Sequence, residues 1–237
     1  VSAGAAFGCA VTIGFLPGWS MQAMAFGFGL LAVFLAYLVA RTQGEASRLT
    51  LVLSGVIVSA FFTSLVSIVK FLVDPHKLQG IVFWLMGSFS LSDWRSFRVV
   101  LTGVIFGILP LMLMRWRLNV MSLSEEEALA LGVNAKRDRI LFILFSTLAV
   151  AVATSVCGII GWVGLMVPHL VRMMVGPDHR TLLPLSLFGG AAFMITADTV
   201  SRTLTAFDIP VGIITAITGA PFFVYLLKKN REEVWER

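Results

Sequence analysis

The sequence predicts an all-α protein whose helices cross a membrane several times. Hydrophobic residues make up 58% of the 237 residues and charged residues only 13%, whereas a soluble domain has about 25% charged residues. The charges are clustered, so they leave long apolar segments of the kind that form transmembrane helices. The alternation that a membrane β-barrel needs is absent. We therefore expect one polytopic transmembrane helical bundle over residues 1–237.

Seven apolar segments can be separated along the chain. They cover residues 1–16, 21–40, 49–73, 99–114, 140–171, 182–203 and 209–227. The fifth segment has 32 residues and would be about 48 Å long as one helix, which exceeds the bilayer core of about 30 Å. Because Gly158, Gly161 and Gly164 offer a break, we predict two short crossings there and eight crossings in all.

A shorter apolar stretch at residues 78–91 contains Gly80 and Gly87. It is too short to cross a bilayer, so we expect it at the membrane interface or as a re-entrant segment. Trp84 and Trp94 would then suit an aromatic belt at the interface.

Small residues near the start of the chain indicate close helix packing. Gly4 and Gly8 have the GxxxG spacing that lets helix backbones approach each other in lipid. Cys9 and Cys157 lie inside apolar runs, so we expect small packed side chains rather than a disulfide or a metal site. The chain opens at Val1 without a signal-peptide pattern, and we expect it to be a piece of a longer protein.

The basic residues predict the orientation, because cytoplasmic loops of membrane proteins are enriched in Lys and Arg. With the start of the first segment in the cytoplasm, thirteen of the eighteen basic residues lie on that side. They are Arg41, Arg48, Arg115, Arg117, Lys136, Arg137, Arg139, Arg172, Arg180, Lys228, Lys229, Arg231 and Arg237. Lys70, Lys77, Arg95, Arg98 and Arg202 fall on the outer side or its margin. We therefore expect both termini of the complete protein in the cytoplasm.

The longest polar stretch, residues 115–139, contains the start signal of a short helix. Ser124 and Glu127 have the spacing of a capping box, in which the hydroxyl accepts from the Glu127 amide and the carboxylate reaches back. Glu125 and Glu126 add negative charge to the first turn, where it suits the helix dipole.

A stop signal and a second start signal follow this helix. Gly132 is a natural residue to end a helix after Leu131. Asn134 can cap a second helix that runs through Lys136 and Arg137 into the next crossing. The stretch therefore predicts two helices joined by a tight turn at residues 132–134.

Two interpretations of residues 118–139 stay open on the pattern alone: an ordinary ordered loop, or a docking element for a soluble partner. The candidate contact residues are Ser124, Glu125, Glu126, Glu127, Leu131, Gly132, Val133, Asn134, Lys136 and Arg137.

Further polar residues gather on the predicted cytoplasmic side. They are Pro168, His169, Arg172, Asp178, His179 and Arg180. Polar residues at the margin of membrane segments usually mark a working surface. The spacing matches no standard metal-ligand pattern, so hydrogen bonding at helix ends is favoured over a metal site.

Arg202 follows Asp198 by four residues near the predicted outer face. This spacing predicts an ion pair along one helix. In a second interpretation, Arg202 joins Arg95 and Arg98 in presenting positive charge to an acidic partner protein.

Several stretches resemble, in chain order, the FecCD-type family of ABC importer permeases for iron chelates and cobalamin. Residues 129–134 (LALGVN) and the basic cluster after them resemble the family's coupling loop, and residues 1–5 resemble the start of its third helix. Residues 161–172 with 178–180 resemble its eighth helix and the loop after it. Residues 183–184, 197–198 and 202 resemble its ninth helix, and residues 210–213 and 219–222 resemble its last. One departure is Asp208, where the family often has Glu. The family has ten helices, so the resemblance implies that the first two are missing here.

The resemblance implies a permease subunit in a bacterial inner membrane that works as a pair with a second copy of itself. Two cytoplasmic ATPase subunits would bind ATP and Mg²⁺ and contact the loop at residues 118–139. A periplasmic or surface-tethered binding protein would dock on the outer arginines. This chain has no P-loop, because none of its five lysines lies between Gly and Ser or Thr. We therefore expect a transport subunit without catalytic residues or a cofactor of its own.

The transported substrate cannot be deduced from these residues. An iron siderophore or haem is expected from family frequency, with cobalamin, molybdate and tungstate as alternatives, carried by alternating access. A secondary transporter driven by an ion gradient would need carboxylates or broken helices at mid-membrane. An intramembrane enzyme would need paired catalytic groups, which are not evident. The net charge of +5 does not indicate nucleic-acid binding, because the basic residues are distributed among loops.

Overall fold

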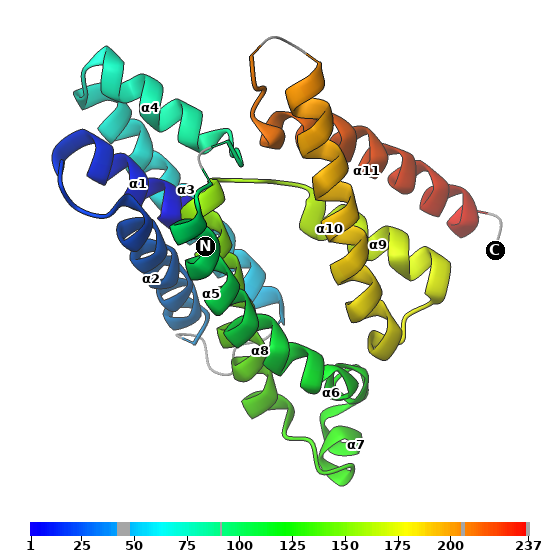
Figure 1. Cartoon of the computed structure of the whole chain (residues 1–237). Helices are drawn as coiled ribbons and strands as arrows, with labels where there is room; N and C mark the ends of the chain where they lie inside the picture. Colours follow the sequence, from blue (N-terminus) through cyan, green and yellow to red (C-terminus); the bar gives the residue numbers. More distant parts are fainter. Residues whose placement is uncertain (42–47, 91, 205–206, 236–237) are drawn as a thin grey trace. The chain divides into compact units, whose positions relative to one another are not determined.

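The computed structural model describes residues 1–41, 48–90, 92–204 and 207–235, and within these ranges it is helical without strands (Figure 1). The predicted crossings correspond to α1 (Ser2–Phe15), α2 (Met21–Arg41), α3 (Arg48–Leu72), α5 (Trp94–Leu113), α8 (Ala135–Cys157), α9 (Val163–Val175), α10 (His179–Thr203) and α11 (Val211–Trp235). The remaining helices are α4 (Pro75–Leu85), α6 (Arg115–Val120) and α7 (Glu125–Ala130). The predicted all-α membrane fold is confirmed, and α6 is a helix that the sequence analysis did not anticipate.

Five of these helices are long and apolar enough to cross a membrane: α2, α3, α5, α8 and α10. The apolar parts of α1, α9 and α11 are shorter. With 13 residues, α9 is about 20 Å long, less than the bilayer core of about 30 Å. The count of eight full crossings therefore stays a prediction for these three helices.

The predicted break in the long apolar segment is confirmed between α8 and α9. Gly158 follows α8 with a φ of 71°, and Trp162 precedes α9 with a φ of 69°. The Val163 N–H donates to the Gly161 carbonyl at 2.8 Å, which closes a γ-turn at Trp162, a rare and strained conformation for a residue with a side chain. The chain thus ends one helix and starts the next within five residues.

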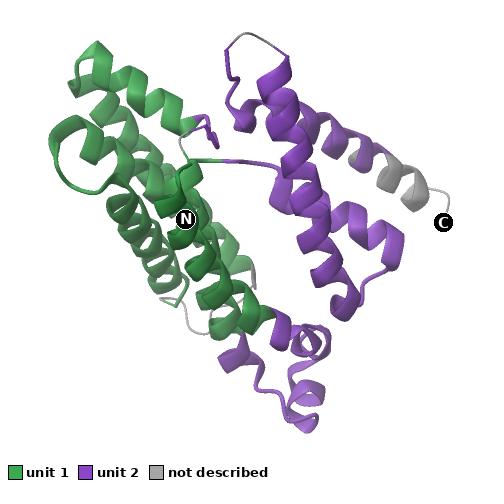
Figure 2. Cartoon of the chain, in the orientation of Figure 1, with its two compact units in different colours: residues 1–85, 91–111, 139–159 green, residues 86–90, 112–138, 160–237 purple. Residues whose placement is uncertain are grey.

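The described helices divide into two compact units (Figure 2). The first unit contains residues 1–85, 91–111 and 139–159. There the predicted close packing at Gly4 and Gly8 is confirmed: a Cβ at Gly4 would collide with the Phe28 carbonyl of α2, and one at Gly8 with the Met24 carbonyl. Similarly, a Cβ at Gly107 of α5 would lie 2.7 Å from that of Ala149 in α8.

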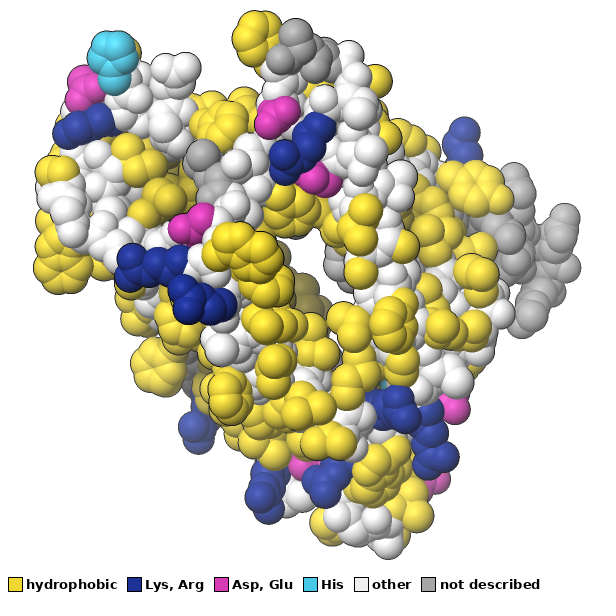
Figure 3. Space-filling view, in the orientation of Figure 1, with side chains coloured by type: hydrophobic (Ala, Val, Ile, Leu, Met, Phe, Trp, Pro, Cys, Tyr) yellow, Lys and Arg dark blue, Asp and Glu magenta, His cyan; other side chains and the backbone are white. Residues whose placement is uncertain are grey.

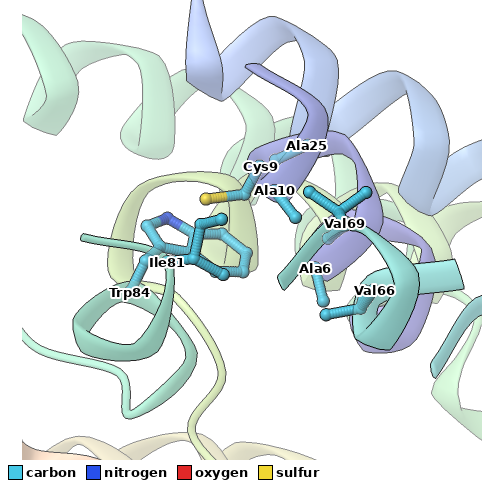
Figure 4. Close-up of a cluster of buried hydrophobic side chains, with 9 residues drawn as sticks. Ala6, Cys9, Ala10, Ala25, Val66, Val69, Ile81 and Trp84 are labelled. Carbon is cyan, nitrogen blue, oxygen red and sulfur yellow. The ribbon is translucent and has the colours of Figure 1, made fainter. Parts of the chain in front are cut away.

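The core of this unit lies where α1 meets α3 and α4. Figure 4 shows Ile81 and Trp84 of α4 near Cys9 of α1, with Val66 and Val69 of α3 on the other side. Trp84 is only 8% exposed, so the prediction that it belongs to an aromatic belt was wrong. Trp84 lies three residues after Ile81, on the face of α4 that packs into the core. Trp94 is exposed, as expected.

The second unit contains residues 86–90, 112–138 and 160–237. In it, α11 approaches the γ-turn so closely at Gly219 that an added Cβ would collide with Trp162. The Gly212 N–H also donates to the Gly87 carbonyl at 3.2 Å. Ser90 Oγ donates to Asp208 at 3.1 Å.

Hydrophobic side chains cover much of the surface in view, and Lys and Arg gather in a few groups (Figure 3). Phe71 of α3 and Phe188 of α10 are among the most exposed. A surface of this kind would aggregate in water, and it suits contact with lipid or with other apolar helices.

Candidate functional site

The polar loop between α5 and α8 is the candidate site, and its central helix, α7, begins with a complete capping box. Ser124 Oγ accepts from the Glu127 N–H at 3.3 Å, and Glu127 Oε2 accepts from the Ser124 N–H at 3.0 Å. The Ser124 hydroxyl also donates to Glu127 Oε2 at 2.9 Å. The hydrogen bonds from the Ser124 N–H and hydroxyl to the Glu127 carboxylate lower the pKa of that carboxyl below its ordinary value. The predicted capping box is therefore confirmed.

The other end of α7 is closed by two backbone hydrogen bonds at Gly132. The Gly132 N–H donates to the Leu129 carbonyl, and the Val133 N–H donates to the Ala128 carbonyl, each at 2.9 Å. This is a Schellman motif, and it needs the φ of 76° that Gly132 adopts. Val133 and Ala128 are buried, as the apolar contact of that motif requires. The predicted stop at Gly132 is confirmed.

The predicted cap of the next helix is also present. Asn134 Oδ1 accepts from the Arg137 N–H at 3.0 Å at the start of α8. The turn at residues 132–134 therefore joins two capped helices, and short capped helices resist bending better than an irregular loop.

An ion pair that the sequence analysis missed connects α6 to the start of α8. Arg117 Nη1 donates to both carboxylate oxygens of Asp138 at 3.0 Å. Asp138 is 1% exposed, so its charge depends on this partner. The signal in the sequence was an acidic residue within a basic cluster, but a separation of 21 residues has no helical period to reveal it.

The outer surface of the loop is partly apolar. Leu129 is 65% exposed and Leu131 is 58% exposed. Glu126 lies three residues before Leu129, on the same side of α7, and Glu126 and Arg137 are exposed as well. Exposed leucines beside charged groups on a rigid helix are typical of a protein-docking surface. We call Glu126, Leu129, Leu131 and Arg137 the docking face; the sequence analysis did not select Leu129.

Asp178 is the N-cap of α10, where its Oδ1 accepts from the Arg180 N–H at 2.9 Å. This bond and a second one from Asn119 of α6 lower the pKa of the Asp178 carboxyl. The prediction of helix-end hydrogen bonding is thus confirmed at Asp178, with a partner in α6 that was not foreseen.

The other polar residues of this group are divided between two helices. Pro168, His169 and Arg172 lie within α9, which ends at Val175, and His179 and Arg180 begin α10. Within the described part of the chain, no three His, Cys, Asp or Glu side chains come together as metal ligands.

The outer arginines are not all in one unit. Arg202 Nε donates to Asp198 Oδ2 at 2.9 Å, which confirms the ion pair predicted along α10 in the second unit. Arg95 and Arg98 are exposed near the start of α5, in the first unit. Asp93 caps this turn by accepting from the Ser96 N–H at 2.8 Å. Their docking role stays a prediction.

Comparison with known protein families identifies the family of this chain. Residues 1–229 match the model of the FecCD transport family, and the chain belongs to this family. It is 43% identical over 231 residues to an iron chelatin transport system permease protein of Helicobacter pylori, covering 98% of this chain and 70% of that protein. It is 43% identical over 237 residues to the molybdate import system permease protein MolB of Haemophilus influenzae, covering 97% of this chain and 70% of that protein.

A solved structure shows the same fold. It is an inward-facing conformation of a metal-chelate type ABC transporter, with a TM-score of 0.89 and 40% sequence identity, and the match covers 96% of this chain and 73% of that one. The resemblance in the sequence is therefore confirmed by family, by relatives and by structure.

Proposed function

We propose that this chain is the membrane-spanning permease subunit of an ATP-binding-cassette importer that carries a metal chelate. The observation that carries the proposal is the capped loop at residues 118–139, in a chain of membrane-length helices that belongs to the FecCD transport family. An importer driven by a separate ATPase needs such an element, because force reaches the membrane helices only through a contact that does not deform. The docking face offers that contact.

The partners follow from the same proposal. The ATPase subunits would bind ATP and Mg²⁺ and press on the docking face, a second copy of the chain would form the other wall of the pathway, and a binding protein would deliver the chelate. The basic residues support a multi-pass orientation in which the docking face lies in the cytoplasm. The names of the relatives give iron chelatin, molybdate, cobalamin and haemin as the transported substrates. The proposed substrate class is therefore a metal chelate or a related oxyanion.

The chain offers little support for a transporter driven by an ion gradient. One feature on which such a transporter relies, besides broken helices, is an available carboxylate within the membrane. Asp198, which lies in α10, is already paired with Arg202.

Uptake by cells from which the encoding gene has been deleted tests the proposal. Labelled ferric siderophore, haemin, cobalamin and molybdate are compared with and without depletion of ATP, and the restored gene is the control. We expect ATP-dependent uptake of one substrate to be lost by deletion and regained by restoration. Uptake that persists without ATP but collapses with the ion gradient would establish the secondary-transporter alternative instead.

A further inference from the structure

Asn119 of α6 completes the first turn of α10 through its side chain. Its Nδ2 donates to Asp178 Oδ1 at 2.6 Å, its Oδ1 accepts from the His179 N–H at 2.9 Å, and the same oxygen lies 2.7 Å from His179 Nδ1. The first N–H groups of a helix have no partner inside it. Asp178 satisfies the N–H of Arg180, and Asn119 satisfies that of His179, from another helix.

The same short helix is tied to α8 two residues earlier. Arg117 forms the ion pair with the buried Asp138, so two residues of α6 that lie two positions apart contact the starts of two membrane helices. With six residues, α6 is about 9 Å long and has little room to bend. It therefore connects α8 and α10 as a rigid spacer.

The two connections differ in kind. The loop at residues 118–139, which we call the docking loop, is covalently continuous with α8 through residues 132–135. Asp178 at the start of α10 lies 59 residues from Asn119 along the chain. The contacts of α6 with α10 are therefore a direct route by which movement of the loop can reach α10. That helix has 25 residues and carries the Asp198–Arg202 pair toward its other end.

We infer that Asn119 is a positioning residue that transmits displacement of the docking loop to α10. The inference rests on the proposed function, because it concerns how force from an ATPase reaches this helix. The partners of the Asn119 side chain are Asp178 and His179, and neither belongs to the docking face. Loss of the Asn119 contacts should therefore leave ATPase docking intact and reduce the transport obtained from each ATP.

Exchanging the amide of Asn119 and the carboxylate of Asp178 distinguishes a role in transmission from a role in stability alone. Asn119→Asp places a second carboxylate against Asp178, where the present contact is 2.6 Å, so repulsion opens the contact. Asp178→Asn alone keeps an oxygen for Asn119 Nδ2 and for the Arg180 N–H. In the double variant, the amide introduced at position 178 donates to the carboxylate introduced at position 119, so this contact is restored with donor and acceptor reversed. The backbone N–H groups of His179 and Arg180 stay donors and still meet an oxygen at positions 119 and 178.

The test uses the complete transporter, reconstituted with its ATPase and binding protein, and measures substrate transported per ATP hydrolysed. We expect Asn119→Asp to lower this ratio at least roughly fivefold, the low end of measured couplings between sites, with full recovery of the ATPase on co-purification. Asp178→Asn should stay near the wild type, and the double variant should regain the ratio. Asn119→Ala, which removes the contacts without repulsion, replaces Asn119→Asp if that variant does not accumulate.

Three results would overturn the inference: an unchanged ratio in Asn119→Asp, a double variant that does not recover, or loss of the ATPase in proportion to transport. These outcomes are distinguishable from failure of the proposed function, in which the wild-type complex itself would show no ATP-driven uptake.

Discussion

The side chain of Arg117 donates to both oxygens of Asp138 at 3.0 Å, and Asp138 is almost fully buried while Arg117 is 37% exposed. The pair joins α6 to the first turn of α8. The two residues are therefore not equivalent, because only Asp138 is left as a buried charge when its partner is removed.

This asymmetry predicts unequal effects of substitution. We expect Arg117→Met to lower the free energy of unfolding by about 3 kcal/mol, the low end for breaking a buried ion pair, since water can reach part of the site. The isosteric Asp138→Asn should cost less, because Arg117 can turn toward water. Thermal unfolding of the purified permease measures both. An equal loss in the two variants would contradict the asymmetry.

The docking face predicts which substitutions would separate the permease from the ATPase that we propose as its partner. Charge reversal at both Glu126 and Arg137, or Leu129→Asp alone, should reduce co-purification of the ATPase, because these side chains are exposed. Thermal stability should change little, since a charge in the first turn of a helix contributes only about 0.3–1 kcal/mol. Leu129→Met, which keeps the apolar area, is the matched control. Undiminished recovery of the ATPase with either disruptive variant would argue that the contact lies elsewhere.

The close approach of α11 to the γ-turn predicts a position that accepts only glycine. Gly219→Ala should destabilise the protein by about 1–3 kcal/mol, the usual cost of overpacking, because the new Cβ collides with Trp162. Gly190→Ala in α10 is the control, since nothing lies within 4 Å of its added Cβ. Thermal unfolding compares the two variants. If Gly219→Ala were as stable as Gly190→Ala, the contact between α11 and Trp162 would have to adjust easily.

The capping box predicts a pH dependence at α7. Because the folded-state pKa of Glu127 is lowered, its ionised form stabilises the helix at every pH above the ordinary value. That stabilisation is lost as the pH falls through the lower value of the folded protein. Carboxyl-carbon NMR of labelled Glu127 should show the lowered pKa, and Ser124→Ala should raise it part of the way, since the Ser124 N–H remains. A titration unaffected by Ser124→Ala would contradict the contribution of the hydroxyl.

The exposed arginines of α5 predict a salt-dependent contact with the binding protein that we propose as a partner. Arg98→Glu should weaken association most at low ionic strength, because charge attraction is screened by salt. Lys228→Glu changes the net charge equally but lies on the side predicted to be cytoplasmic, so it is the control. Equal affinities for the two variants at low salt would remove Arg98 from the docking surface.

Local patterns were sufficient to predict much of this fold. The capping box, the stop at Gly132 and the pairing of Asp198 with Arg202 depend on residues no more than four positions apart. The break at residues 158–162 followed from length and glycine content. Such features could be predicted because helix geometry alone determines which neighbours meet.

Contacts between distant residues could not be predicted in this way. Asn119 with Asp178 and Arg117 with Asp138 join residues 59 and 21 positions apart, and no spacing rule connects them. The burial of Trp84 was missed for the same reason. It depends on packing against distant residues of α1 and α3, whereas a tryptophan side chain by itself suits a membrane interface as well as a protein core.

Both ends of α7 are capped by hydrogen bonds within residues 124–133, so the helix does not depend on other parts of the chain for its caps. This local capping bears on how such transporters diversify. The residues whose hydrogen bonds close the helix and the residues of the docking face are different ones, so the docking-face positions can change without unfolding the loop. Partner choice could therefore evolve, or be re-engineered, by exchanging Glu126, Leu129 and Leu131 alone, while Ser124, Glu127 and Gly132 stay constant as the frame on which each new specificity is displayed.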